Sequence, residues 1–283
     1  MSSFRDKLRK GQLPTEAEWE EHLKEAHKDE PRMTPEAFAG YKTADGKNSY
    51  DVLADVMPKG DWQVLDLACG DGHLIPYLLP KLGAKAQVLG ADMSEDGIQI
   101  AQKRITDPRV KFAVARAQQL PLKDASIDFI LCHMALMLMA PLPPVMTELR
   151  RVLKSTGVLS AVIGGGTSTG FYKEMQKLTG VFVQAHLPRY HESRQGSGTL
   201  AEDLAATFGE VDTYEFFLHY NVPPEGVWEY MRNMYFVPML PDSAQREFKD
   251  ELINAARGKV DANGKVSFQV PMRRLTSPGS AAD

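Results

Sequence analysis

The chain has 283 residues, of which 43% are hydrophobic and 25% charged, so it is long enough for one large α/β domain with a cover or for two small domains. Its 33 basic and 37 acidic residues give a formal charge of -4 without a basic stripe, which argues against a nucleic acid as partner. The chain has two cysteines, so we expect neither a disulfide framework nor a zinc site. It has no apolar window of membrane-span length, and we therefore expect a cytoplasmic protein without a membrane span.

The first fifty residues are predicted to be helical. Thr15 and Glu18 have the spacing of a capping box that opens a helix through about residue 28, and Thr34, followed by a proline, marks a second helix start. Because this segment precedes the first core strand and carries several aromatic residues among many charges, we expect residues 1–50 to cover the mouth of a ligand site.

An apolar run that ends in a glycine-rich turn is the most informative motif. Residues 61–67 are predicted to form a buried strand that leads into the turn at residues 68–72 and then into an amphipathic helix. Gly70 and Gly72 can adopt backbone angles barred to other residues, which lets a ligand approach the main chain, and the helix start would supply free N–H groups. The pattern is typical of a nucleotide-binding turn.

Three residues narrow the choice of nucleotide. Asp66 closes the first strand, where a carboxylate suits a positively charged ligand better than a pyrophosphate. A second predicted strand over residues 86–92 ends at Asp92, where a parallel sheet holds a ribose. Ile75 stands where a dinucleotide fingerprint has its third glycine, so an NAD-dependent oxidoreductase is the weaker alternative.

The rest of the chain continues the alternation of strands and helices that is typical of an α/β fold. Residues 51–166 are predicted to form the core, with further strands at 110–115, 127–133 and 157–163 and a helix over 148–157 capped by Gly157. After it we expect an inserted substrate lid over 167–198 with a helix at 171–186, the remainder of the core over 199–275, and a disordered tail over 276–283. Within that remainder we predict a helix at 200–208, strands at 210–222 and 266–272 that form an antiparallel hairpin, and a helical stretch at 223–257 broken at Pro238 and Pro241.

Between about residues 50 and 163 these features resemble the class I S-adenosylmethionine-dependent methyltransferases, in particular the small-molecule group similar to the ubiquinone-biosynthesis C-methyltransferases. The resemblance rests on Asp66, Gly70, Gly72 and Asp92. It implies a Rossmann-like, doubly wound, mostly parallel sheet of seven strands with an antiparallel last strand. It also implies S-adenosylmethionine as the cofactor, with its methionine part at the acidic strand end and glycine turn and its ribose hydroxyls on Asp92.

One departure from the family concerns the adenine base. The family usually has an Asp-Ala pair before Leu-Pro that contacts adenine, whereas residues 115–121 here read Ala-Arg-Ala-Gln-Gln-Leu-Pro. Arg116 stands where the acid is expected, so Gln118 or the backbone of Ala117 is the candidate contact. The cofactor-binding residues that we expect are Tyr41, Asp66, Ala68, Cys69, Gly70, Gly72, Asp92, Met93, Ala117, Gln118, Cys132 and His133.

His133 is the candidate catalytic residue. Methyl transfer from a sulfonium is an in-line displacement that depends mainly on positioning and on a dry pocket, and it needs a base only when the acceptor loses a proton. His133 follows the fourth predicted strand and belongs to the residue type that titrates near neutral pH. The alternative is that His133 only packs beneath the cofactor.

The acceptor side is less well marked in the sequence. Apolar and aromatic residues that could form an adaptable wall predict substrate contacts at Met137, His186, Trp228, Met231 and Tyr235, although the same spacing describes an ordinary core. We therefore expect methylation of an oxygen, nitrogen or carbon atom of a small, largely apolar or aromatic metabolite, without a metal, by a monomer or homodimer. The alternatives are a non-catalytic S-adenosylmethionine-binding module and the oxidoreductase.

Overall fold

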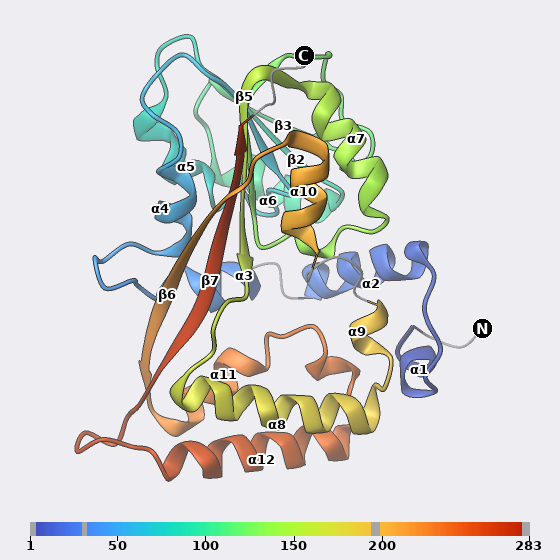
Figure 1. The fold of residues 1–283 in the computed structure, drawn as a ribbon, viewed down its shortest axis with the longest axis vertical. Helices are drawn as coiled ribbons and strands as arrows, with labels where there is room; N and C mark the ends of the chain where they lie inside the picture. The colour runs from blue at the N-terminus through green and yellow to red at the C-terminus, as the bar shows by residue number, and fades with distance from the viewer. Residues whose placement is uncertain (1–3, 30–32, 194–198, 279–283) are drawn as a thin grey trace.

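A seven-stranded sheet with the order β3-β2-β1-β4-β5-β7-β6 organises the chain in the computed structural model, which describes residues 4–29, 33–193 and 199–278 (Figure 1). The strands are β1 (Gln63–Leu67), β2 (Gln87–Asp92), β3 (Val110–Val114), β4 (Ile127–His133), β5 (Leu153–Gly164), β6 (Asp212–Val222) and β7 (Val266–Pro278). Neighbouring strands from β3 to β5 are parallel, whereas β7 is antiparallel to both β5 and β6. The predicted doubly wound sheet with a reversed last strand is confirmed.

Helices cover the sheet on both faces and form a further group below it. The first six are α1 (Phe4–Arg9), α2 (Glu16–Asp29), α3 (Met33–Phe38), α4 (Ser49–Ala54), α5 (Ile75–Leu78) and α6 (Glu95–Arg104). The others are α7 (Leu142–Val152), α8 (Gly170–His186), α9 (Tyr190–Ser193), α10 (Leu200–Phe208), α11 (Pro224–Met231) and α12 (Asp242–Arg257), with 3-10 helices η1 (Leu79–Lys81), η2 (Leu136–Leu138) and η3 (Val237–Met239). Across the described ranges, no helix has the length and apolarity needed to cross a membrane.

The local sequence explains where several elements begin and why they are buried. The Thr15 amide donates to Glu18 Oε2 at 2.8 Å and the Glu18 amide donates to Thr15 Oγ1 at 3.3 Å, so the predicted capping box opens α2. Strand β4 is buried along most of its length, as a continuous apolar run in a parallel sheet requires. These two elements therefore follow from local pattern alone.

The β6–β7 hairpin extends beyond the parallel strands and carries a separate layer of helices. Figure 1 shows α8, α11 and α12 packed together at the far end of the hairpin, with α2 between this layer and the sheet and α1 beside the layer. Leu8 and Trp19 from the N-terminal helices belong to the same buried core as the sheet. The N-terminal segment is thus packed into the molecule on two sides.

The helices α5 and α7 differ from what the sequence suggests. Helix α5 has four residues and begins at Ile75, because positive φ angles at Gly70 and Gly72 keep the preceding residues in successive turns. Helix α7 ends at Val152 rather than Gly157, because the buried Leu153 pairs with Ile127 as the first residue of β5. The register then moves to Phe129 opposite Val158, which leaves a bulge where the glycine cap was expected.

The predicted disordered tail was also partly wrong. Residues 276–278 are the last residues of β7 and pair with residues 158–160 of β5. The Ser277 hydroxyl is buried and donates to the Glu210 carbonyl at 2.9 Å, which satisfies a polar group inside the fold. Residues 279–283 of the predicted tail lie outside the described residues.

Candidate cofactor and active site

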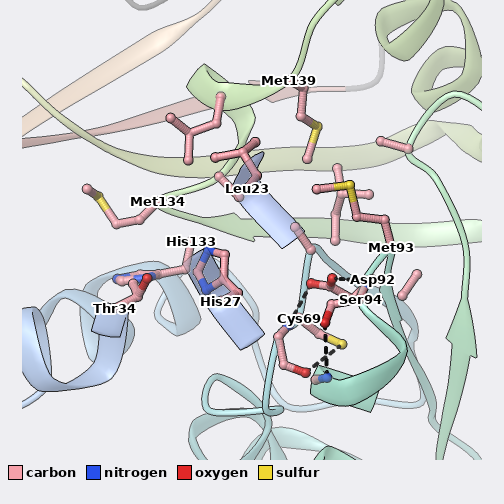
Figure 2. Close-up of a pocket in the computed structure, with 18 of the residues that line it drawn as sticks. Leu23, His27, Thr34, Cys69, Asp92, Met93, Ser94, His133, Met134 and Met139 are labelled. Atoms are coloured by element: carbon pink, nitrogen blue, oxygen red, sulfur yellow. Dashed lines mark hydrogen bonds between the residues drawn. The ribbon is translucent and has the colours of Figure 1, made fainter. Parts of the chain in front are cut away.

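A cavity opens at the carboxyl ends of β1, β2 and β4, the edge of the sheet where the parallel strands deliver their loops. Its floor and walls come from the turn after β1, the loops after β2 and β3, and the segment after β4. Its roof comes from α2 and α3 through Glu20, Leu23, His27, Thr34 and Pro35 (Figure 2). The N-terminal helices are therefore part of the site.

The turn after β1 is held in a conformation that favours glycine. Gly70 has a φ angle of 53° and Ala68 one of 56°, so the chain turns twice through the left-handed region. Gly97, at the start of α6, lies so near that a Cβ there would meet the Gly70 carbonyl oxygen at 3.2 Å. Met134, which follows β4 and also lines the cavity, has a φ angle of 55°. Ala68 and Met134 therefore both line the cavity with a left-handed backbone conformation, although neither is a glycine. Such strained conformations occur often at functional sites.

Asp92 is fixed at the end of β2 by two backbone amides. Its Oδ2 accepts from the Gly70 amide and its Oδ1 from the Ser94 amide, each at 2.8 Å. Figure 2 shows Asp92, Ser94 and Cys69 gathered on this side of the cavity. A carboxylate oxygen has room for a second hydrogen bond, so Asp92 can still accept from two neighbouring hydroxyls of a ligand.

Asp66 is a buried carboxylate with an unused oxygen. Its Oδ2 has no hydrogen-bond partner among the residues that the structure describes. Burial, followed by the charges of Asp92 and Asp71, raises the pKa of Asp66 well above its ordinary value. Arg104 pairs with Asp71. A ligand that brings a positive group to this corner would supply the hydrogen bond and charge that Asp66 lacks, so the residues present fit the ammonium of an amino acid.

His133 stands at the end of β4 in a closely packed aromatic group. Its Nε2 lies 2.9 Å from the Ser49 hydroxyl, and its ring stacks on Tyr50 with the centroids 3.7 Å apart. Nδ1 is buried and has no partner within the described ranges. Burial, with a smaller effect of His73, lowers the pKa of His133 to about 3, so the ring is neutral near pH 7.

Helix α2 is attached to the rest of the site at three points. Glu20 pairs with Arg116 from the loop after β3. The Trp19 indole donates to the Leu138 carbonyl at 2.9 Å, and His27 Nε2 lies 2.8 Å from the Tyr235 hydroxyl. Burial lowers the pKa of His27, against a smaller opposing effect of Asp92. Because these contacts join segments that are far apart in the chain, the roof depends on the complete fold.

The structure brings most of the expected cofactor residues to one cavity and leaves three outside its lining. The residues that line it are Asp66, Ala68, Cys69, Gly70, Asp92, Met93, Ala117, Gln118 and His133. Tyr41 instead stacks on Tyr220 with centroids 3.6 Å apart, because its neighbour Lys42 forms an isolated β-bridge with β6. Gly72 packs beneath Ala101, and Cys132 is buried inside the sheet, where burial raises the pKa of its thiol to about 12.

Of the five expected substrate residues, Tyr235 lines the cavity and the other four lie elsewhere. Met137 and Met231 are buried in the core. Trp228 packs edge-on against Phe248 with Lys249 over its ring, and His186 stacks on Phe182 at the end of α8. The apolar spacing around Met231 and Trp228 therefore serves packing between α11 and α12. Residues 167–191 of the proposed lid also contribute nothing to this lining, and residues 194–198 lie outside the described residues.

The roof residues were not identified from the sequence. Glu20, Leu23 and His27 are separated by three and four residues, a spacing that places them on one face of a helix. Because two of the three side chains are polar, this face of the helix resembles an ordinary solvent-exposed helix face, and the pattern does not indicate a ligand-binding surface. Their partners Arg116 and Tyr235 lie far along the chain, and no local signal connects them.

Comparison with known proteins agrees with the fold. Residues 58–178 match a family described as "Methyltransferase domain". A demethylmenaquinone methyltransferase of Symbiobacterium thermophilum is 26% identical over 130 residues, which are 38% of this chain and 52% of that protein. A 2-phytyl-1,4-naphtoquinone methyltransferase of Trichormus variabilis is 35% identical over 94 residues, 32% of this chain and 41% of that protein. The chain thus spans about half the length of the curated relatives it matches.

Solved structures support the fold in particular. A putative type II methyltransferase from Anaeromyxobacter dehalogenans superposes with a TM-score of 0.58 at 22% identity, covering 82% of this chain and 96% of that one. The YcgJ protein of Bacillus subtilis superposes with a TM-score of 0.56 at 16% identity, covering 83% and 99%. The fold is that of the Rossmann-like methyltransferases. Residues 58–178, which match the methyltransferase domain, contain strands β1 to β5 of this sheet.

Proposed function

We propose that this protein transfers a methyl group from S-adenosylmethionine to an oxygen, nitrogen or carbon atom of a small, largely apolar or aromatic metabolite. One observation carries the proposal: Asp66, a buried carboxylate with one unpartnered oxygen among the described residues, lines the same cavity as Asp92, whose carboxylate is oriented by two amides. The first group suits an ammonium and the second suits a pair of ribose hydroxyls. A ligand that carries both features is an adenosylated amino acid.

The chain's own residues provide binding, orientation and exclusion of water. Asp92 would hold the ribose and Asp66 the amino group, while Leu23 and Leu138 close the cavity with apolar surface. The bound cofactor supplies a methyl group on a positively charged sulfur. A dry, apolar surround favours a reaction in which that charge is neutralised by the acceptor, and holding the two reactants in contact lowers the barrier further.

His133 is proposed to act as a neutral hydrogen-bonding group in this cavity. A pKa of about 3 makes the ring a weak proton acceptor at neutral pH, because the best general bases have a pKa near the working pH. Its unpartnered Nδ1 can accept a hydrogen bond from a hydroxyl or amine of the acceptor. The role is therefore one of orienting the acceptor beside the methyl group.

The class of acceptor is inferred from the apolar part of the cavity and from the relatives. Met134, Leu138 and Met139, which follow β4 in the chain, line the cavity, and methionine side chains adapt to ring systems of different shape. The relatives named above are called quinone methyltransferases. An aromatic or quinone-like ring is the acceptor that we propose. Two buried free cysteines support a reducing, cytoplasmic location, and the protein is proposed to act as a monomer or homodimer without nucleic acid.

Titration calorimetry with S-adenosylhomocysteine tests the cofactor assignment. We expect the wild type to bind, and we expect Asp92→Ala to bind at least about tenfold more weakly, because the ribose hydroxyls lose a charged acceptor. Asp96→Ala, an exposed carboxylate at the start of α6, is the matched control and should bind like the wild type. Absence of binding to the wild type at high protein concentration would refute the proposal.

Turnover distinguishes an enzyme from a module that only binds the cofactor. Wild-type protein with radiolabelled S-adenosylmethionine should transfer label to at least one member of a panel of phenols, naphthoquinols and aromatic amines. Cofactor binding without transfer to any of these acceptors would favour the non-catalytic alternative.

A further inference from the structure

The cavity has an internal direction that follows the order of the strands. Asp66 ends β1 and Asp92 ends β2, and β3 lies next to β2 on the side away from β1. If the proposed function is correct, the amino acid part of the cofactor lies at β1 and the ribose at β2. The base, which extends beyond the ribose, then lies against the loop after β3, residues 115–118, which lines the cavity.

That loop has no carboxylate to offer the base. Its side chains are Ala115, Arg116, Ala117 and Gln118. The exocyclic amino group of adenine is a hydrogen-bond donor and needs an acceptor, and a charged acceptor gives the stronger bond. Arg116 has only donors, so it cannot fill this role.

Helix α2 brings a carboxylate to this end of the cavity. Glu20 lines the cavity and pairs through Oε1 with Arg116. Its side chain is 17% exposed, whereas that of Arg116 is 55% exposed, so the carboxylate lies on the inner side of the pair. Because the contact with Arg116 is made through Oε1, and carboxylate oxygens accept more than one hydrogen bond, the Glu20 carboxylate can accept a further one. The other carboxylates of the lining, those of Asp66, Asp71 and Asp92, belong to the β1 and β2 ends.

We propose that Glu20, held in place by Arg116, accepts a hydrogen bond from the exocyclic amino group of the adenine base. Recognition of the base then comes from the N-terminal roof rather than from the sheet loop. It follows that the cofactor joins α2 to the β3 side of the cavity, because the Glu20 carboxylate contacts Arg116 and the base together. The inference rests on the proposed function.

A comparison of two ligands on each of three proteins tests this assignment. The ligands are S-adenosylhomocysteine and its analogue with an unsubstituted purine, which lacks the 6-amino group. The proteins are wild type, Glu20→Ala and Glu21→Ala, the last an exposed neighbour that serves as matched control. We expect the wild type and Glu21→Ala to bind the purine analogue about tenfold more weakly than the adenosine compound, the effect of one lost hydrogen bond to a charged group.

In Glu20→Ala, the dissociation constant of the purine analogue divided by that of S-adenosylhomocysteine should fall to within about twofold of one. The 6-amino group then has no carboxylate to contact, so its removal from the ligand changes the affinity little. Glu20→Gln, which retains the shape of the side chain without its charge, serves if the alanine variant does not fold, and its ratio should lie below that of wild type. A wild-type ratio that persists in the Glu20 variants would overturn the inference, and so would a wild-type ratio near one. Failure of the wild type to bind S-adenosylhomocysteine would instead reject the proposed function.

Discussion

Burial sets the acid–base character of individual side chains around the cavity. The pKa of His133 falls to about 3 and that of Asp66 rises well above its ordinary value, because both groups are removed from water and the charges that act on them have the same sign as their own. Each residue thereby favours its neutral form. A ligand that brings an ammonium to Asp66 reverses this preference, which makes the carboxylate responsive to the charge of what binds.

Substitution of His133 separates orientation from proton transfer. We expect His133→Ala to lower kcat at saturating cofactor by about tenfold to a hundredfold, since the acceptor loses the group that orients it. His133→Gln, whose amide oxygen can accept a hydrogen bond from the acceptor in place of Nδ1, should recover most of this loss. Steady-state kinetics with the best acceptor from the panel measures both effects. An equal, large loss in the two variants would show that the ring accepts a proton after all.

The expected cofactor residues that share one cavity are those marked by local sequence. Asp66, Gly70 and Asp92 line it together, and strand ends and a glycine turn are readable from adjacent residues. Tyr41 was expected in the same cavity but packs on Tyr220, since a bridge between Lys42 and β6 directs this segment. The cofactor contacts of these residues remain predictions.

Strand β2 shows how closely the elements of the site approach one another. A Cβ on Gly90 would lie 2.7 Å from the ring of Phe112 on the neighbouring strand β3. It would also lie 3.0 Å from Cys69 Sγ in the glycine-rich turn after β1. Gly90 lies between Asp66 and Phe112 in the sheet register. Any side chain at this position therefore pushes on the glycine turn directly.

The substitution Gly90→Ala should destabilise the fold by about 1–3 kcal/mol, the usual effect of overpacking, and weaken binding of S-adenosylhomocysteine. Gly40→Ala is the matched control, because a Cβ at this exposed turn position would meet nothing within 4 Å. Urea denaturation measures the free energy of unfolding, and calorimetry measures the affinity. Equal stability of the two variants would show that Phe112 and Cys69 move aside without cost.

At the scale of the whole molecule, the N-terminal helices join the sheet to the lower helical layer. Arg9 donates to the carbonyls of Met239 and Leu240 at 2.8 and 3.0 Å, and Trp19 donates to the carbonyl of Leu138. Figure 1 shows α2 lying between the two layers and α1 beside the lower one. Cofactor binding under α2 is therefore expected to stabilise the molecule as a whole, by the usual linkage of binding to folding.

Acid should destabilise the protein through its buried histidines. Burial lowers the pKa of His22 to about 4 and that of His133 to about 3, both below the ordinary value of 6.5. Between those values the unfolded chain binds more protons, so stability is lost as pH falls from about 6.5 to 4. The slope for each residue is about 1.4 kcal/mol per pH unit in the middle of this window. Asp66, with its raised pKa, opposes the trend in the same range.

Chemical denaturation between pH 7 and pH 4 measures this dependence. The double variant His22→Gln/His133→Gln should show a shallower fall in unfolding free energy than the wild type, because two groups that titrate only in the unfolded state are gone. Asp66 is present in both proteins, so its effect cancels in the comparison. Parallel curves for the two proteins would contradict the assigned protonation states.

The sequence by itself determined where the core strands lie along the chain, the turn between Asp66 and Gly72, and Asp92 at the next strand end. Each of these depends on residues adjacent in the chain, through strand periodicity, glycine conformation and the shared edge of a parallel sheet. The tertiary structure decided which residues roof the cavity and which of the aromatic residues are only core. Glu20 meets Arg116 across 96 positions and His27 meets Tyr235 across 208, and such pairings arise from packing of the whole chain rather than from any local pattern.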